Sequence, residues 1–394
     1  MPENAHEAGR GADVMKTGIL TFHYAHHYGA QLQAYALMRA IGLLGADCEI
    51  INYVRADNIE ASSLFRKGLS PRSVLSNLDT LMHYSKFRKR HERFNSFMRN
   101  EMKLSEKFYG SYEELVKDPP VYDIYVCGSD QIWNPLIFSE KNYDPAFFAE
   151  FAPGGRRVSY APSFGISSIP EDKREQLAQM LAKFDHLSVR EKQGEKIIRE
   201  ITGRDAVTVL DPTLLLTGDQ WGSLAVPPVN SEPYILCYFI TDARKYGQYV
   251  EAVSERYRLP VVSLCGSRRT VPQTSRKVLD AGPAEFLGLF KSASVVCTDS
   301  FHGTVFSINF KKEFYSFDSS NDPVKAVNSR QHNILDMTGL GTRLYSLADG
   351  IDGFRGLIGR EAVAIDYTQA DKILQRKREE SFLYLKEALG LQPG

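Results

Sequence analysis

The chain has 394 residues, with 48 Lys and Arg against 48 Asp and Glu, so its formal net charge is zero. This balance gives no general attraction to nucleic acid or to an anionic membrane, so any bound anion must be held by a local arrangement of groups. A hydrophobic fraction of 43% with 24% charged residues is typical of folded globular proteins, and a chain of this length usually forms two domains.

The first segment, residues 1–14, is polar and acidic and lacks the cationic start and apolar stretch of a secretory signal. We expect a loose tail, with the folded part beginning near Met15. No apolar run is long enough to span a bilayer, which favours a cytoplasmic protein and leaves peripheral membrane association open. Five cysteines lie in or beside apolar runs, and we expect buried reduced thiols at Cys48, Cys127, Cys237, Cys265 and Cys297.

The first elements predict a βαβ unit. Residues 18–22 form a short apolar run suited to a buried parallel strand, and a polar loop follows over 23–30. Residues 30–45 carry apolar side chains near the helical period and end on a glycine. The next strand is expected over 48–54, so strand, helix and strand alternate as in a doubly wound sheet.

Composition then divides the rest of the chain. Residues 55–114 are rich in Arg, Lys and Ser and predict a helical insertion, whose basic run favours a solvated helix face over nucleic-acid binding. Strand-like runs resume at 122–128, so we expect a first Rossmann-like domain over 15–217 and a Pro-rich linker over 218–232. A second Rossmann-like domain is expected over 233–345. The segment 346–394 should end in a helix that returns to the first domain.

The most informative motif is Asp-Ser-Phe-His-Gly at the end of an apolar strand that runs directly into a helix. The carboxyl ends of parallel strands are where open α/β sheets bind ligands, and unpaired amides at a helix start favour a phosphate or carboxylate. Gly303 permits close approach of the backbone, while Ser300 and Thr304 can cap the helix or donate. His302 could transfer protons there, although a histidine packed at the turn is the alternative.

A second strand end leads into Cys-Gly-Ser-Asp-Gln-Ile-Trp-Asn-Pro, residues 127–135. Small residues followed by an acid, an amide and an aromatic are typical of a substrate-recognition loop. We expect Ser129, Asp130 and Gln131 to bind substrate, with hydrogen bonds from Asp130 and Gln131 to sugar hydroxyls. Trp133 is expected to stack on a sugar face. An ordinary turn explains the same residues less specifically.

Two arginines are candidates for an anion clamp, because a guanidinium can hold a carboxylate or phosphate by two hydrogen bonds. Arg190 ends an apolar strand, and a structural salt bridge is its alternative interpretation; Arg330 precedes a helical run and is otherwise a surface residue. Tyr28 and Gly29 open the first helix and should face the same cleft. The neighbouring histidines lack carboxylate or thiolate partners for zinc, and no dinucleotide-binding or Walker motif is present, so no metal site is expected.

Taken in order, these segments resemble the polysaccharide pyruvyl transferase family from Lys16 to about Thr342. The resemblance is carried by ILTFHYAHHYGAQLQAYAL, CGSDQIWNP, YAPSFG, LSVREKQG, VLDPTLLL, the DSFHG turn and the NSR segment. It implies two Rossmann-like domains facing across a cleft, as in GT-B glycosyltransferases. Many members have Arg-Leu-His where this chain has Ser300-Phe301-His302, and related sequences often have Asn at the position of His27.

The resemblance also implies an activity in polysaccharide biosynthesis. Family members transfer the pyruvate group of phosphoenolpyruvate onto sugar hydroxyls, commonly as a cyclic ketal, with release of phosphate and without a metal or organic cofactor. In this scheme His302 transfers protons, Arg190 is the principal anion clamp, and Arg330 is a second candidate. The acceptor sugar would be carried on a lipid, a nucleotide or a polymer. A GT-B-type glycosyltransferase using a nucleotide sugar, and a non-catalytic glycan-binding or regulatory protein, are the alternatives.

Overall fold

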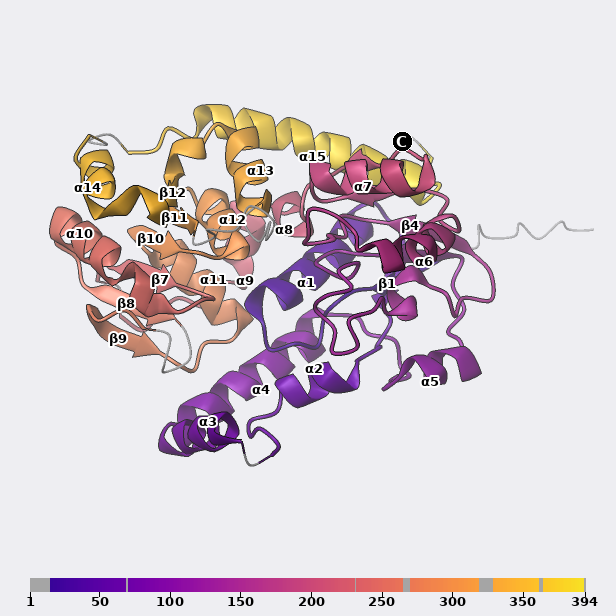
Figure 1. Cartoon of the computed structure of the whole chain (residues 1–394), viewed down its shortest axis with the longest axis horizontal. Coiled ribbons are helices and arrows are strands. Elements are labelled where there is room, and N and C mark those ends of the chain that lie inside the picture. The colour runs from indigo at the N-terminus through magenta and orange to yellow at the C-terminus, as the bar shows by residue number, and fades with distance from the viewer. Residues whose placement is uncertain are drawn as a thin grey trace, which may run out of the picture.

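The computed structural model describes residues 15–68, 70–230, 232–264, 270–318, 329–360 and 364–392, which form two α/β domains (Figure 1). The predictions for the tail over 1–14 and for Cys265 lie outside these residues. The other four cysteines are buried and free, as predicted.

The first domain is built on a parallel sheet near the amino terminus. Its strands lie in the order β2 (Asp47–Ile50), β1 (Lys16–Leu20), β3 (Ile124–Cys127) and β4 (Arg156–Ser159). A short parallel pair, β5 (Ser188–Val189) and β6 (Val207–Thr208), lies beyond β4. Parallel sheets are covered on both faces, so their strands appear in the sequence as continuous apolar runs. The helices of this domain are α1 (Tyr28–Leu43), α6 (Glu171–Leu181), α7 (Lys192–Thr202) and α8 (Pro212–Leu215), with the 3₁₀ turn η1 (Pro145–Phe148).

The second domain repeats this alternation around a longer parallel sheet. Its strands lie in the order β12 (Leu344–Ser346), β11 (Glu313–Asp318), β10 (Val295–Thr298), β7 (Ile235–Tyr238), β8 (Val261–Leu264) and β9 (Thr274–Val278). The helices are α10 (Gly247–Tyr257), α11 (Pro283–Ser292), α12 (Phe301–Asn309), α13 (Ser329–Thr338) and α14 (Gly350–Arg360), with 3₁₀ turns η2 (Ala243–Tyr246), η4 (Gly341–Arg343) and η5 (Leu347–Asp349). Two parallel sheets with connecting helices confirm the predicted pair of Rossmann-like domains.

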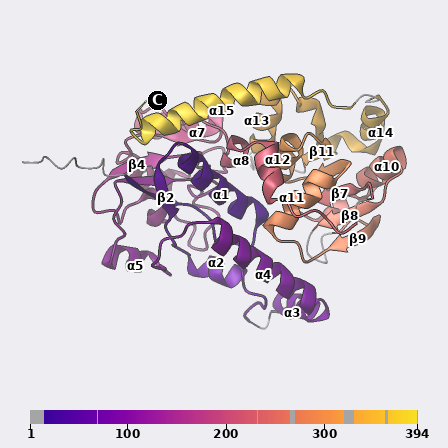
Figure 2. The same cartoon turned by 180° about the vertical axis from the view of Figure 1, so that it is seen from behind.

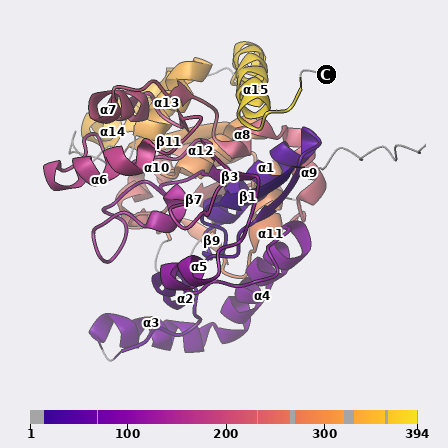
Figure 3. The same ribbon diagram turned by 90° about the vertical axis from the view of Figure 1, so that its right-hand side faces the viewer.

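The segment between β2 and β3 is helical. It contains α2 (Ala56–Ala61), α3 (Pro71–Met82), α4 (Tyr84–Glu101) and α5 (Tyr112–Lys117). Helices α3 and α4 extend away from the sheet as a hairpin, with α3 at the edge of the molecule in both Figure 1 and Figure 3. The base of α4 is anchored by Phe94 and Phe97, which are buried against α1 and are two of the aromatic residues at helical spacing in the sequence.

The domains share a core, and this corrects the predicted linker. Helix α9 (Gly218–Leu224) occupies the first half of the range 218–232, with a hydrogen-bonded capping box at Thr217. Trp221 is fully buried and packs on Tyr35 of the first domain and Phe306 of the second. Helices α1 and α11 lie side by side at this junction (Figure 2). The proline-rich composition therefore hid a helix that joins the two domains.

The last helix, α15 (Thr368–Ala388), leaves the second domain and runs back across the first, as Figure 1 shows. Tyr384 donates a hydrogen bond to the carbonyl of Ser159 at 2.8 Å, and Arg378 donates to the carbonyl of Leu214 at 2.6 Å. No helix in the described parts of the chain is both long and apolar enough to cross a membrane.

Candidate active site

The junction between β10 and α12 lies at the centre of the candidate site. Ser300 caps α12, and its Oγ accepts a hydrogen bond from the Gly303 amide at 3.3 Å. A Cβ at Gly303 would lie 2.2 Å from Thr298 Oγ1, so only glycine allows the helix to start this close to the strand. Thr304 is fully buried and donates to the Ser300 carbonyl. The expectation that Thr304 and the Gly303 amide bind an anion is therefore wrong, because both serve the helix itself.

His302 occupies the first turn of α12 and faces the first domain. Its ring packs so closely on Gly29 that a Cβ there would lie 2.1 Å from His302 Nδ1. Nε2 is buried and has no hydrogen-bond partner among the described residues. Burial lowers the pKa of His302 to about 4, against the opposing effect of Asp211 and Asp130. The imidazole is therefore neutral at pH 7, and its Nε2 is left unpaired by the described residues next to the cavity that His302 lines.

A cavity of about 280 Å³ lies between the domains beside His302. Ligand cavities usually measure about 300–1,000 Å³, so this one suits a small substrate. The first domain contributes Phe22, Ala25, His27, Ala30, Asp57, Asn58, Asp130, Gln131, Ile137 and Phe138 to its wall. The second domain contributes Ile240, Ser300, Phe301, His302 and Arg330.

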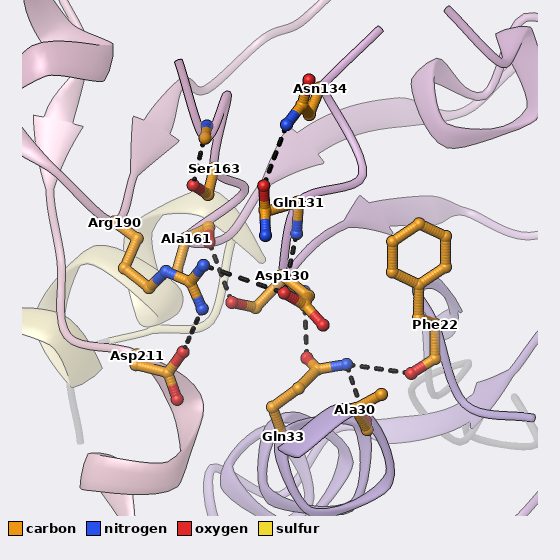
Figure 4. A network of polar contacts seen from close by, with 12 residues as sticks. Phe22, Ala30, Gln33, Asp130, Gln131, Asn134, Ala161, Ser163, Arg190 and Asp211 are labelled. Carbon is orange, nitrogen blue, oxygen red and sulfur yellow. Dashed lines mark hydrogen bonds and ion pairs between the residues drawn. The ribbon is translucent and has the colours of Figure 1, made fainter. Parts of the chain in front are cut away.

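Arg190 is not among the residues that line this cavity, and Figure 4 shows it beside the carboxylates of Asp130 and Asp211. Its Nη1 donates to Asp211 Oδ2 at 2.6 Å, its Nε donates to Glu191 Oε1 at 3.2 Å, and Nη2 lies 3.8 Å from Asp130 Oδ1. Burial opposes the charge of Arg190, but these three carboxylates outweigh it and raise the pKa of Arg190 above its usual range. The arginine expected to be the principal anion clamp is thus already compensated by the protein.

Arg330, in contrast to Arg190, has no direct partner for its guanidinium among the described residues. It lines the cavity, and within the described residues no hydrogen bond or ion pair to its guanidinium is found. Burial and the nearby Arg190 lower the pKa of Arg330, in spite of the opposing effect of Glu191, Asp130 and Asp211. The Cζ atoms of Arg190 and Arg330 lie 4.9 and 5.6 Å from the centre of the same ring, that of Phe301. Arg330 is therefore the cation that a bound anion could reach.

The loop after β3 brings two of its four predicted residues to the cavity. Asp130 has a positive φ of 67°, which turns its carboxylate toward Arg190, and Gln131 lies beside it (Figure 4). The backbone amide of Gln131 donates a hydrogen bond to Asp130 Oδ1 at 2.9 Å. Burial would raise the pKa of Asp130, but Arg190, His302 and Arg330 more than offset it and hold that pKa below its usual value. Asp130 is therefore an ionised acceptor for hydroxyl groups.

The other two residues of this loop belong to the core. Ser129 is fully buried, and its Oγ donates to the Ala161 carbonyl at 2.8 Å. Trp133 is 0% exposed and stacks on Phe148 with 5.3 Å between ring centres. Its Nε1 donates to the Phe147 carbonyl. The expectations that Ser129 binds substrate and that Trp133 stacks on a sugar are wrong, because neither side chain reaches the cavity.

Tyr28 and Gly29 act between the domains. The hydroxyl of Tyr28 donates to the Ala281 carbonyl at 2.9 Å, and its ring stacks on Phe286 at 4.6 Å. Gly29 makes room for the ring of His302. Both residues position the site, and neither lines the cavity beside His302.

Sequence reasoning missed several residues of the site. Asp211 follows a strand and precedes Pro212, and its Oδ1 accepts from both the amide and the hydroxyl of Thr213. That Asp-Pro-Thr pattern was a signal for a fixed carboxylate. His27 and Asp57 line the cavity from the first domain, in segments that resembled a polar loop and an insertion. The described residues contain no group of three or more His, Cys, Asp or Glu that could hold a metal ion.

The sequence pattern described as polysaccharide pyruvyl transferase matches residues 27–321, which include His27 and Ala30 beside the cavity, the Asp130 loop, Arg190 and the α12 junction. The chain belongs to this family. It is therefore a transferase, and two segments that the family resemblance rested on, the CGSDQIWNP loop and the DSFHG turn, contribute residues to the cavity. Among curated protein sequences none matches the chain.

Several solved structures are similar in outline. The UDP-GlcNAc 2-epimerase of Methanocaldococcus jannaschii is 12% identical with a TM-score of 0.45, covering 92% of this chain and 99% of its own. A putative UDP-N-acetylglucosamine 2-epimerase from Listeria monocytogenes is 10% identical with a TM-score of 0.49 over 96% and 98% of the two chains. MurG of Acinetobacter baumannii is 8% identical with a TM-score of 0.45 over 96% and 100%.

Proposed function

We propose that this family member transfers the pyruvate group of phosphoenolpyruvate to hydroxyls of a polysaccharide or its precursor, forming a pyruvate ketal and releasing phosphate. The observation that carries the proposal is Arg330, a cation in the cavity wall without a partner among the described residues. A partly buried guanidinium is costly unless an anion compensates it. Phosphoenolpyruvate offers a phosphate and a planar carboxylate, and the carboxylate matches the two-pronged geometry of arginine.

The two domains would hold different substrates. The second domain brings the guanidinium of Arg330 and the hydroxyl of Ser300 to the cavity, and these groups suit the anionic donor. The first domain brings the carboxylates of Asp57 and Asp130. Carboxylates repel an anion but accept hydrogen bonds from hydroxyls, so the sugar acceptor belongs on that side.

His302 transfers the proton in this scheme. The methylene carbon of the donor gains a proton, a sugar hydroxyl attacks the neighbouring carbon and loses its own proton, and the bond from that carbon to the phosphate oxygen breaks. A second hydroxyl then forms the second carbon–oxygen bond of the ketal. The proton lost by one sugar hydroxyl restores the proton that His302 gave to the methylene carbon. The proton lost by the other hydroxyl leaves with the released phosphate. The bound anions favour the protonated imidazole, which raises the pKa of His302 above its value of about 4 in the empty site.

Arg190 takes a positioning role in this proposal, and Arg330 becomes the anion clamp. The ion pair between Arg190 and Asp130, at 3.8 Å, helps to orient the carboxylate that faces the acceptor. Its other two pairs, with Asp211 and Glu191, connect it to the starts of α8 and α7.

The proposal is tested by incubating the purified protein with phosphoenolpyruvate and a panel of lipid-linked, nucleotide-linked and free sugars. Phosphate release that depends on one acceptor, with a pyruvate ketal in the product, is the expected result. Nucleotide release from sugar donors is measured in parallel. If nucleotide is released and phosphate is not, the enzyme is a glycosyltransferase and the proposal is wrong.

A further inference from the structure

Helix α3 exposes the face that a helix in a globular protein normally buries. Its apolar side chains recur at helical spacing and are between 42% and 74% exposed: Val74, Leu75, Leu78, Leu81 and Met82. Its polar side chains lie on the other side and line a groove: Ser73, Ser76, Asp79 and Thr80. A contiguous exposed apolar face of this kind marks an interaction surface. We refer to the five apolar residues as the apolar face of α3.

Cations surround this face, although the whole chain is neutral. Between residues 62 and 90 there are seven arginines and lysines and the single acid Asp79. Arg66 lies beside α3, because Asn77 accepts a hydrogen bond from its amide at 2.9 Å and donates one to its carbonyl at 3.0 Å. Arg66, Lys67 and Lys86 are exposed, and the described residues provide no ion pair for them. The hairpin is therefore cationic at Arg66, Lys67 and Lys86, whereas Arg88 is paired with Glu92, Lys89 with Asp280, and Arg90 lies over the rings of Tyr28 and Phe94.

The charge decides which partner fits the apolar face. A second copy of the chain that packed the same face against it would bring two cationic hairpins together, which is unfavourable. An anionic lipid surface satisfies both features, because it takes up apolar side chains below the headgroups and attracts the basic residues around them. We propose that the α3–α4 hairpin docks on the surface of an anionic membrane, with the apolar face of α3 in the interface.

Docking would place the groove next to the lipid surface. The groove measures about 950 Å³ and shares His27, Asp57 and Ile240 with the cavity beside His302, so the two spaces adjoin each other. A sugar carried on a membrane lipid could then reach the cavity along the polar face of α3. This consequence rests on the proposed function, whereas the docking itself does not.

The test is flotation of the full chain with phosphatidylcholine vesicles that contain or lack phosphatidylglycerol, so neither donor nor acceptor is needed. Binding to the anionic vesicles, weakened by salt, is the expected result. The double variant Leu78→Glu and Leu81→Glu should lower the bound fraction by about tenfold or more, since it removes two buried apolar side chains and adds two negative charges. Lys86→Glu should lower it several-fold.

Matched controls lie on α15. Leu383 is 58% exposed and Lys372 is exposed, so Leu383→Glu matches a single leucine substitution and Lys372→Glu matches Lys86→Glu away from the hairpin, and both should bind as the wild type does. Equal binding by the hairpin and control variants would overturn the proposal, as would a wild type that ignores both vesicles. A concentration-dependent dimer that the double variant abolishes would assign the face to a second copy instead. Loss of phosphate release with vesicle binding intact would contradict the proposed function and leave the docking standing.

Discussion

Arg190 and Arg330 contact the same ring, that of Phe301, yet only Arg190 is paired directly with carboxylates among the described residues. Arg190 has three carboxylates within 3.8 Å, contributed by the loop after β3, the N-cap of α7 and the N-cap of α8. Arg330 lines a cavity and has no such partner among the described residues. An arginine compensated by the fold holds the structure together, whereas one left uncompensated is suited to bind an anion.

Substitution of His302, which lines the same cavity as Arg330, should have the largest effect on turnover. His302→Gln keeps a polar side chain of similar size but cannot exchange a proton, so turnover should fall by about a hundredfold to ten-thousandfold. The measurement is phosphate release at saturating phosphoenolpyruvate, with urea unfolding to show that the fold is kept. Unchanged turnover in a folded variant would remove His302 from the chemistry.

Substituting Arg190 and Arg330 by methionine, one at a time, should change the free energy of unfolding by different amounts. Arg190→Met leaves Asp211 and Glu191 buried without their cation and should cost about 3–5 kcal/mol in the free energy of unfolding. Arg330→Met removes a partly buried charge whose burial and neighbouring Arg190 outweigh the nearby carboxylates, so it should leave stability unchanged or raise it. Urea denaturation of both variants makes the comparison. Equal losses would show that Arg330 is structural too.

A smaller effect is expected in the pH dependence of the free energy of unfolding, because His302 is buried and neutral in the folded protein. The pKa of His302 is about 4 in the folded protein and about 6.5 in an unfolded chain. Between these values the unfolded chain binds a proton that the folded protein does not, so stability falls as the pH drops from about 6.5 to about 4. The part of this loss that His302 contributes should reach roughly 3 kcal/mol at most and should not grow below the lower value, and His26, whose pKa burial also lowers to about 4, adds its own part.

His302→Gln should flatten that profile, because glutamine takes up no proton in either state. Bound phosphoenolpyruvate should flatten it as well, since an anion at Arg330 favours the imidazolium. Thermal unfolding across this pH range, with and without phosphoenolpyruvate, provides both comparisons. A wild type and variant with the same slope would contradict the buried, neutral state of His302.

The fold was predictable because its strands are continuous apolar runs, which identify a parallel sheet without any knowledge of pairing. The helix after β10 was predictable for a similar local reason, since Ser300 and Gly303 mark a helix start. The prediction of a linker over 218–232 was wrong for its first half because it relied on the proline content of the segment. Trp221 in α9 packs between the two domains. Only the assembled fold shows that this short helix has partners on both sides.

The sequence indicated where the candidate site lies, but it did not indicate which of its side chains form ion pairs with each other. Asp130, Gln131, Ser300 and His302 all reach the cavity from strand ends, as their place in the sequence indicated. Arg190 and Asp211 are 21 residues apart, so nothing local shows that they form an ion pair at 2.6 Å. The loop after β3 had the same difficulty, because residue type does not reveal which side chains turn into the core.

The central claim is that Arg330 holds the anionic donor while Arg190 holds the fold. Titration of phosphoenolpyruvate into wild type and Arg330→Gln by calorimetry, without acceptor, tests it most directly. The variant should bind phosphoenolpyruvate about tenfold more weakly or worse, with its thermal stability kept. Arg244→Gln, an exposed arginine on η2, is the matched control and should bind as the wild type does. If Arg330→Gln binds phosphoenolpyruvate as tightly as the wild type, the account of this site is wrong.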